Sequence, residues 1–208
     1  MTKPHIVRKF DPASAGANTP RLEHLALWSE DIDATAAFLD DALGWKRHPI
    51  VFGVDEDNET FGGMSLAFID ANGLWIEPVQ PTTDGPGMEF LKAKGNGALV
   101  ELDFAVDDFD KNIETMRAKG IELIGMDGKA LKDRGLLSEW VMIDGKRERG
   151  DELLSYLPFD VARGTSIELF WEYPNGVILL RDKMVEGKTL TPKSAARLNH
   201  VAVLAEDV

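Results

Sequence analysis

Four residues combine side-chain types and spacing that could hold a metal ion. His24 and Glu101 lie near the start of two similar stretches of sequence, and Glu77 and Glu168 lie in apolar stretches that follow later in each. One imidazole and three carboxylates, brought to one point, would form an oxygen-rich site of the kind that hard divalent cations prefer. The sequence must therefore supply elements that carry these four side chains to a common place.

Those elements belong to a repeated pattern. An apolar strand followed by an acidic pair occurs over Leu22–Asp33, again over Val100–Asp110, and a third time over Leu198–Val208. The acidic pair is typical of a helix N-terminus, because a carboxylate there accepts hydrogen bonds from free backbone N–H groups. A spaced repeat of this kind indicates that one supersecondary unit has been duplicated and that a third unit begins near residue 198.

The pattern predicts an α+β chain with two βαβββ modules, each a strand, a helix and three further strands. In the second module we expect strands over 99–106, 121–125, 137–143, 153–158 and 165–173, with the charged run 144–151 outside them. The predicted divisions are a flexible N-terminal arm (1–20), a first module (21–80), a linker (81–97), a second module (98–176), and a connector with the start of a possible third module (177–208).

Alternation along the strands decides where the ionisable groups point. His24 shares a face with Trp28, and Glu101 shares one with Asp103, while the intervening residues form apolar faces that helices should cover. A single Glu in such a strand is often at a solvent edge, and a lone His is often a satisfied core residue. If the modules pair with pseudo-twofold symmetry, however, His24, Glu77, Glu101 and Glu168 meet in a partly buried hollow. Buried carboxylates are usually paired, protonated or bound to a metal.

Composition narrows the class of protein. The 208 residues are 44% hydrophobic, carry a formal net charge of −13 and include no cysteine. The acidic balance argues against nucleic acid or an anionic membrane as a partner, and the absence of cysteine excludes disulfides and thiolate metal sites. The first 20 residues lack the apolar core of a signal peptide, and we expect a soluble cytoplasmic protein.

The motifs around these residues resemble the vicinal oxygen chelate superfamily, which includes glyoxalase I, bleomycin resistance proteins and extradiol dioxygenases. The resemblance covers roughly residues 21 to 175. The stretches that carry it are Leu22–Leu27, Ile76–Pro81, Leu102–Asp108 and Gly164–Phe170. It implies two paired βαβββ modules that form a cupped mixed sheet around a divalent metal, with ligands from the first and last strands of each module.

Carried over to this sequence, the resemblance implies His24, Glu77, Glu101 and Glu168 as metal ligands. The sequence departs from the family at Glu101, where most members have His. A set of one His and three carboxylates favours Mn²⁺, Mg²⁺, Fe²⁺ or Co²⁺, and Ni²⁺ or Zn²⁺ stay open. Asp103, on the same face, adds a further negative charge.

The resemblance implies Lewis-acid chemistry on a small-molecule substrate, and an isomerase, epimerase or lyase acting next to a carbonyl group is the first hypothesis. The residues considered as the base are Glu101 and Glu59, although Glu59 needs a rearranged loop. An extradiol-type dioxygenase is the second hypothesis; it requires two His ligands, and His48 lies outside the pattern while His200 depends on how the tail folds. A metal-free binding or resistance protein is the third, with aromatic residues such as Trp28 facing a planar ligand. Such modules pair within one chain or between the chains of a homodimer.

Overall fold

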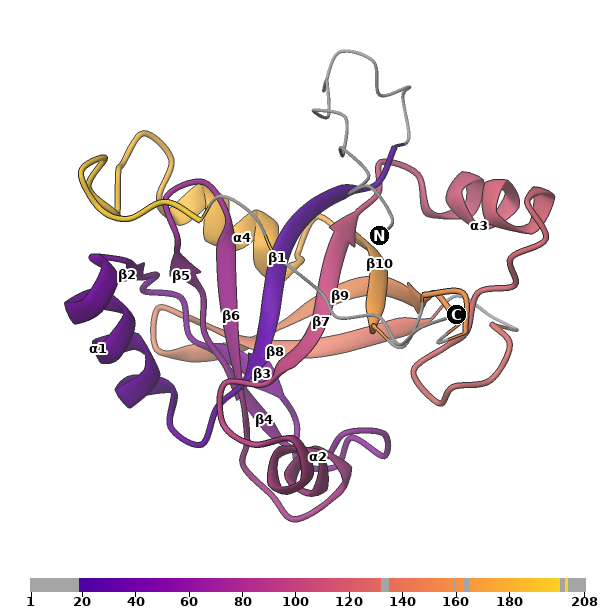
Figure 1. The fold of residues 1–208 in the computed structure, drawn as a ribbon, viewed down its shortest axis with the longest axis horizontal. Coiled ribbons are helices and arrows are strands. Elements are labelled where there is room, and N and C mark those ends of the chain that lie inside the picture. Colours follow the sequence, from indigo (N-terminus) through magenta and orange to yellow (C-terminus); the bar gives the residue numbers. More distant parts are fainter. Residues whose placement is uncertain (1–18, 132–134, 159, 163–164, 199–200, 202–208) are drawn as a thin grey trace, which may run out of the picture.

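The sheet is arranged as the repeat predicts. The structure, a computed structural model, describes residues 19–131, 135–158, 160–162, 165–198 and 201 (Figure 1). The first module contains β1 (Arg21–Trp28), α1 (Ile32–Leu43), β2 (Lys46–Arg47), β3 (Phe52–Val54), β4 (Met64–Leu66), β5 (Ile69–Asp70) and β6 (Trp75–Pro81). After α2 (Pro86–Lys94), the second module contains β7 (Leu99–Ala105), α3 (Phe109–Ala118), β8 (Leu136–Ile143), β9 (Lys146–Tyr156) and β10 (Ile167–Glu172), and α4 (Val177–Met184) follows.

The ten strands form one mixed sheet that closes on itself. Its order is β1-β7-β10-β9-β8-β3-β4-β6-β5-β2, and an additional parallel pairing of β6 with β1 completes a ring. In each module the first strand pairs in parallel with the last strand. The modules meet twice, through the antiparallel pairs β1–β7 and β3–β8. The duplicated units therefore enclose a common interior, as the cupped arrangement requires.

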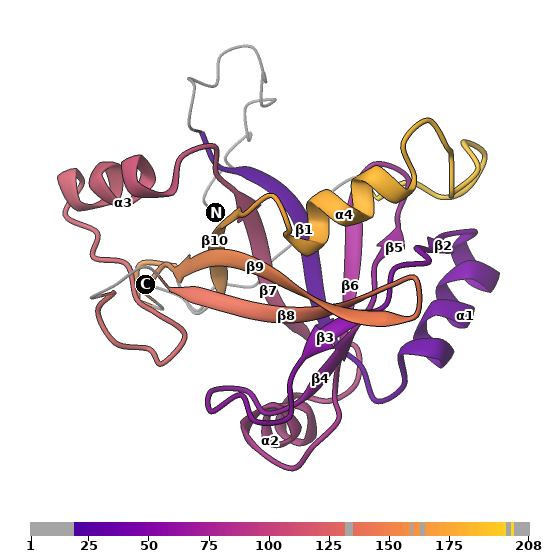
Figure 2. The ribbon, with the colours of Figure 1, turned by 180° about the vertical axis from the view of Figure 1, so that it is seen from behind.

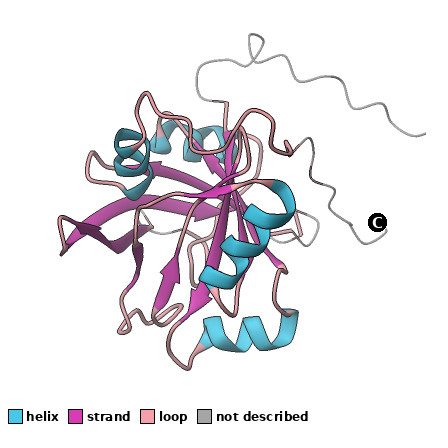
Figure 3. Cartoon of the chain, turned by 90° about the vertical axis from the view of Figure 1, so that its left-hand side faces the viewer, coloured by secondary structure: helices cyan, strands magenta, loops and turns pink. Residues whose placement is uncertain are grey.

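Helices α1 and α3 begin and end where their sequences indicate, and Figure 3 shows helices packed against the outside of the strands. Asp31 accepts a hydrogen bond from the Ala34 N–H at the start of α1, and Asp108 makes the equivalent bond at the start of α3. At the end of α1, Gly44 takes a left-handed backbone conformation (φ 74°). Such a conformation favours glycine.

Each of these helices covers an apolar outer face of the sheet. One cluster of buried residues joins α1 to β1 and β6 and includes Leu25, Ala36 and Ile76. A second joins α3 to the second module and includes Phe109 and Leu169. With their apolar sides covered in this way, the strands turn their mixed faces toward the interior of the ring.

Two expectations for the second half of the chain were wrong in detail. Residues 121–125 are a loop in which Ile124 forms isolated bridges with Ala130 and Tyr156, because this segment leaves α3 at Gly120 without a full-length partner strand. The charged run 144–151 is mostly part of β9, since β8 and β9 form a long hairpin with a turn at Asp144 and Gly145 (Figure 2). The connector contains helix α4, whose N-terminal N–H groups are held by Glu172.

The segment after α4 returns to the first module. The Trp45 indole donates a hydrogen bond to the Ala196 carbonyl (2.7 Å), and the Thr191 hydroxyl donates to the Asp70 carbonyl (2.6 Å).

Most of the predicted N-terminal arm lies outside the described residues. The same is true of most of the predicted start of a third module. Among the helices that the structure describes, none has the length and apolar character needed to cross a membrane.

Candidate metal centre

The interior of the ring holds a cavity of about 600 Å³. The four residues predicted as metal ligands, His24, Glu77, Glu101 and Glu168, all line it. Glu59 does not; it is exposed in the loop before β4, so the structure does not bring this candidate base to the site. His48 is buried between β2 and β3, away from the cavity lining, and His200 lies outside the described residues.

Strand pairing explains why the four predicted ligands meet. Across β1 and β7, His24 pairs with Asp103 and Ala26 pairs with Glu101. A twofold axis between the two strands would exchange these two pairs, so that His24 takes the place of Glu101 and Ala26 the place of Asp103. Ala26 also pairs with Glu77 on β6, just as Asp103 pairs with Glu168 on β10. His24 and Glu101 are therefore equivalent positions, and Asp103 is an extra carboxylate where the first module has a buried alanine.

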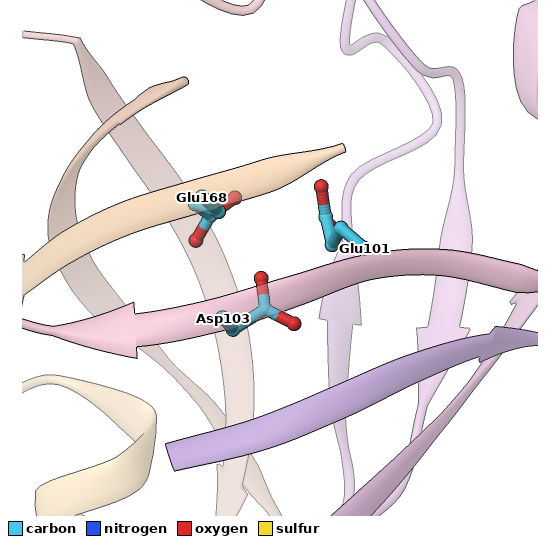
Figure 4. Close-up of side chains that lie close together, drawn as sticks. All are labelled: Glu101, Asp103 and Glu168. Carbon is cyan, nitrogen blue, oxygen red and sulfur yellow. The ribbon is translucent and has the colours of Figure 1, made fainter. Parts of the chain in front are cut away.

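Asp103 is the centre of the cluster. Its side chain is 1% exposed, and its Oδ2 atom lies 3.3 Å from His24 Nε2 without forming a hydrogen bond to any described residue. The Glu77 carboxylate lies 3.5 Å from the same nitrogen. On the other side, ligand atoms of Glu101, Asp103 and Glu168 lie within 4.8 Å of one another (Figure 4). Like charges so close together are unfavourable unless protons or a cation compensate them.

The pKa values reflect this crowding. Burial raises the pKa of Asp103 well above its usual range, together with the charges of Glu168 and Glu77, although His24 opposes the change. Burial and the same neighbours raise the pKa of Glu101. The pKa of Glu168 rises to about 7 because it is buried, even though a hydrogen bond from Tyr156 acts in the opposite direction. Without a cation, these carboxyl groups therefore keep their protons to higher pH than isolated carboxyl groups do.

His24 is held by a residue that strand alternation would place on the other face. Glu23 is the extra residue of a β-bulge in β1, and Val100 occupies the equivalent bulge in β7. A bulge redirects side chains, so Glu23 reaches back, with its Oε2 2.5 Å from His24 Nδ1. Burial lowers the pKa of His24, but Asp103, Glu77 and Glu23 together raise it well above its usual value.

A buried arginine completes this arrangement. Arg181 of α4 is 1% exposed and donates a 2.6 Å hydrogen bond to Glu23 Oε1. Its guanidinium also lies over the rings of Phe68 and Trp75, 4.5 and 4.3 Å from their centroids. Although burial would raise the pKa of Glu23, the contacts with His24 and Arg181 lower it to about 2. Glu23 is thus a fixed acceptor for the Nδ1–H of His24, which directs Nε2 into the cavity.

Comparison with known proteins agrees with this architecture. The family model described as the Glyoxalase/Bleomycin resistance protein/Dioxygenase superfamily matches residues 23–135. The chain belongs to this superfamily. The match spans the first module and the start of the second, and the structure extends the superfamily fold through β10. No curated protein sequence matches the chain.

Solved structures show the same fold. Methylmalonyl-CoA epimerase from Mycobacterium tuberculosis is 19% identical, with a TM-score of 0.54 over 82% of this chain and 95% of that chain. A second methylmalonyl-CoA epimerase is 16% identical, with a TM-score of 0.54 over 77% of this chain and 99% of that one. A hypothetical protein from Bacillus halodurans C-125 is 18% identical, with a TM-score of 0.52 over 74% and 96% of the two chains. At such identities the similarity concerns the fold alone.

Proposed function

We propose that this protein is a divalent-metal-dependent isomerase that moves a proton next to a carbonyl group of a small substrate. The observation that carries the proposal is the buried Asp103 oxygen, which faces the cavity without a hydrogen bond and has His24 and Glu77 beside it. A buried carboxylate of this kind is stabilised by a cation.

The separations of the side-chain atoms suit one ion. In an octahedral site with bonds of about 2.1 Å, neighbouring ligand atoms lie roughly 3 Å apart. The distances from His24 Nε2 to Asp103 and Glu77, 3.3 and 3.5 Å, are close to this value. Ligand atoms of Glu168, Asp103 and Glu101 also lie within 4.8 Å of one another. Of these we assign Glu168, with Asp103, to the ion. The contact of Nδ1 with Glu23 supports ligation through Nε2, because a carboxylate behind a metal-bound imidazole fixes its orientation.

Glu101 is the residue we assign as the base. It is only half-buried, whereas Asp103, Glu168, Glu77 and His24 are all buried. Burial and the neighbouring carboxylates raise its pKa, and a glutamate with a raised pKa is a stronger base than an exposed one. When bound, a divalent ion would polarise the substrate carbonyl and make the neighbouring C–H more acidic. Glu101 would remove that proton and deliver it again, while the apolar lining of the cavity limits access of water.

Two similar structures are methylmalonyl-CoA epimerases, and this supports proton transfer beside a carbonyl over other reactions of the superfamily. No observation favours the dioxygenase, because His24 is the only histidine among the described residues that line the cavity. The aromatic lining would serve a metal-free binding protein as well as an enzyme, but it does not account for the crowded carboxylates around Asp103.

The test separates the metal ligands from the base. Protein loaded with Mn²⁺ is incubated in heavy water with methylmalonyl-CoA and with a panel of other carbonyl compounds, and exchange of the α-proton is followed by NMR. Asp103→Asn should lose the metal, measured by mass spectrometry. Glu101→Gln should keep it and lose exchange by about a hundredfold or more. Glu148→Gln, at an exposed position in β9, is the matched control. Exchange that needs no metal, or that survives in Glu101→Gln, would refute the proposal.

A further inference from the structure

The cavity carries further carboxyl groups besides those assigned to the candidate metal centre. Glu139 on β8, Glu152 on β9 and Glu172 on β10 also line it. Glu152 and Glu172 face each other across the β9–β10 pair. Glu139 pairs with Gly150, and Leu137 pairs with Glu152, so Glu139 and Glu152 are diagonal neighbours on the same interior face. We call Glu139, Glu152 and Glu172 the distal acidic wall.

Only one member of the distal acidic wall has an evident structural task. Both carboxylate oxygens of Glu172 accept backbone N–H groups at the start of α4, at 2.6 and 2.8 Å. Glu139 is 9% exposed, and among the described residues none donates a hydrogen bond to its carboxyl group or forms an ion pair with it. A buried carboxyl group that faces a cavity without a partner needs a ligand to compensate for its lost hydration.

The rest of the lining indicates the charge of that ligand. Among the described residues around the cavity, Lys94 is the only lysine or arginine, and it is exposed at the end of α2. A divalent ion at the metal centre would bring two positive charges to a cavity that seven carboxyl groups of the described residues line. The cavity is also lined by several aromatic rings, and a ring with an open face can attract a cation. The rings are those of Trp28, Phe52, Phe61, Phe68, Phe90 and Tyr156. The face of Phe68 already lies against the Arg181 guanidinium.

From this combination we propose that the distal acidic wall binds a substituted ammonium group, so that the substrate is an organic cation with a carbonyl group at the metal end. The inference rests on the proposed function in one respect, namely that the cation is part of the substrate. It departs from methylmalonyl-CoA, because the carboxylate of that substrate would lie among like charges in this cavity.

Binding of choline tests this inference. Its affinity is compared by calorimetry with that of the uncharged carbon analogue, in which a tert-butyl group replaces the trimethylammonium group, with and without Mn²⁺. The protein should bind choline at least about tenfold more tightly than the analogue. Glu139→Gln and Glu152→Gln should each reduce this preference severalfold, and the exposed Glu148→Gln should leave it unchanged.

Equal affinity for both compounds, no binding of choline, tighter binding of methylmalonyl-CoA, or an unchanged preference in both wall variants would overturn the inference. Metal content is measured on the same samples. A protein that prefers choline but takes up no divalent ion would refute the metal-dependent isomerase and leave the ammonium site standing. A protein that takes up the ion but shows no preference for choline would refute the ammonium site and leave the metal-dependent isomerase standing.

Discussion

Replacing Glu168 with glutamine should stabilise the metal-free protein at alkaline pH. Glu168 is buried, and its pKa rises from the ordinary value of 4.5 to about 7. A carboxyl group whose pKa is raised by folding stabilises the folded state below its unfolded pKa, and this contribution is lost as the pH rises through the folded pKa. The wild-type protein should therefore lose stability between about pH 5 and pH 8.

The magnitude follows from the two pKa values. At about 1.4 kcal/mol for each pH unit, the change from 4.5 to about 7 corresponds to about 3 kcal/mol of unfolding free energy. Metal-free Glu168→Gln cannot ionise at this position. The unfolding free energy of the variant minus that of the wild type should therefore be larger at pH 8 than at pH 5 by about this much. Its side chain has nearly the same volume, so packing against Tyr156 should change little.

The assay is urea unfolding after dialysis against a chelator, at both pH values, with the exposed Glu148→Gln as the control. Adding Mn²⁺ should stabilise the wild type and not Glu168→Gln, because the variant lacks one ligand. If the stability difference between Glu168→Gln and wild type is the same at pH 5 and pH 8, the electrostatic account of the cluster is incorrect.

Three further variants test other parts of the structure. Glu23→Gln should weaken Mn²⁺ binding about tenfold or more, measured by calorimetry, because the support behind His24 is lost. Arg181→Met should lower the unfolding free energy by about 3 kcal/mol in urea titrations, since it leaves the Glu23 carboxylate buried without its cation; a loss below about 1 kcal/mol would show that this ion pair matters little. Gly53→Ala should destabilise the packing of β3 against β4 and β8 by at least about 1 kcal/mol in thermal unfolding, because a Cβ there would lie 2.1 Å from the Met64 carbonyl oxygen on β4 and 2.6 Å from Trp140 Cζ2 on β8; unchanged stability would mean that these strands are loosely packed.

The repeat and the alternation of apolar residues were enough to predict the order of strands and helix in each module, and the four residues that they singled out all line the cavity. His24 and Glu101 are recognisable as equivalent because each lies in the same pattern, and the paired strands place them around one axis. The face that Asp103 shares with Glu101 was also predictable from alternation. Its central position was not, because that depends on how two modules meet.

Other site residues could not be inferred from strand alternation. Glu23 contacts His24 only because a bulge breaks the register of β1, and nothing in the alternation of residues marks that bulge. Arg181 reaches the site from α4, in a segment predicted as a connector. Glu139 and Glu152 face the cavity because β8 and β9 form a longer hairpin than their charged turn region indicated. Long-range packing placed each of these residues.

Anomalous X-ray scattering from crystals grown with Mn²⁺ tests the central claim most directly. If the metal centre is as proposed, one strong peak should appear in the cavity. It should mark an ion bonded to His24 Nε2 and to carboxylate oxygens of Glu77, Asp103 and Glu168, with Glu101 adjacent. The same peak should be absent from crystals of Asp103→Asn. A cavity without a peak at saturating Mn²⁺ near neutral pH, or a peak bound elsewhere on the chain, would contradict the metal centre and the isomerase that depends on it.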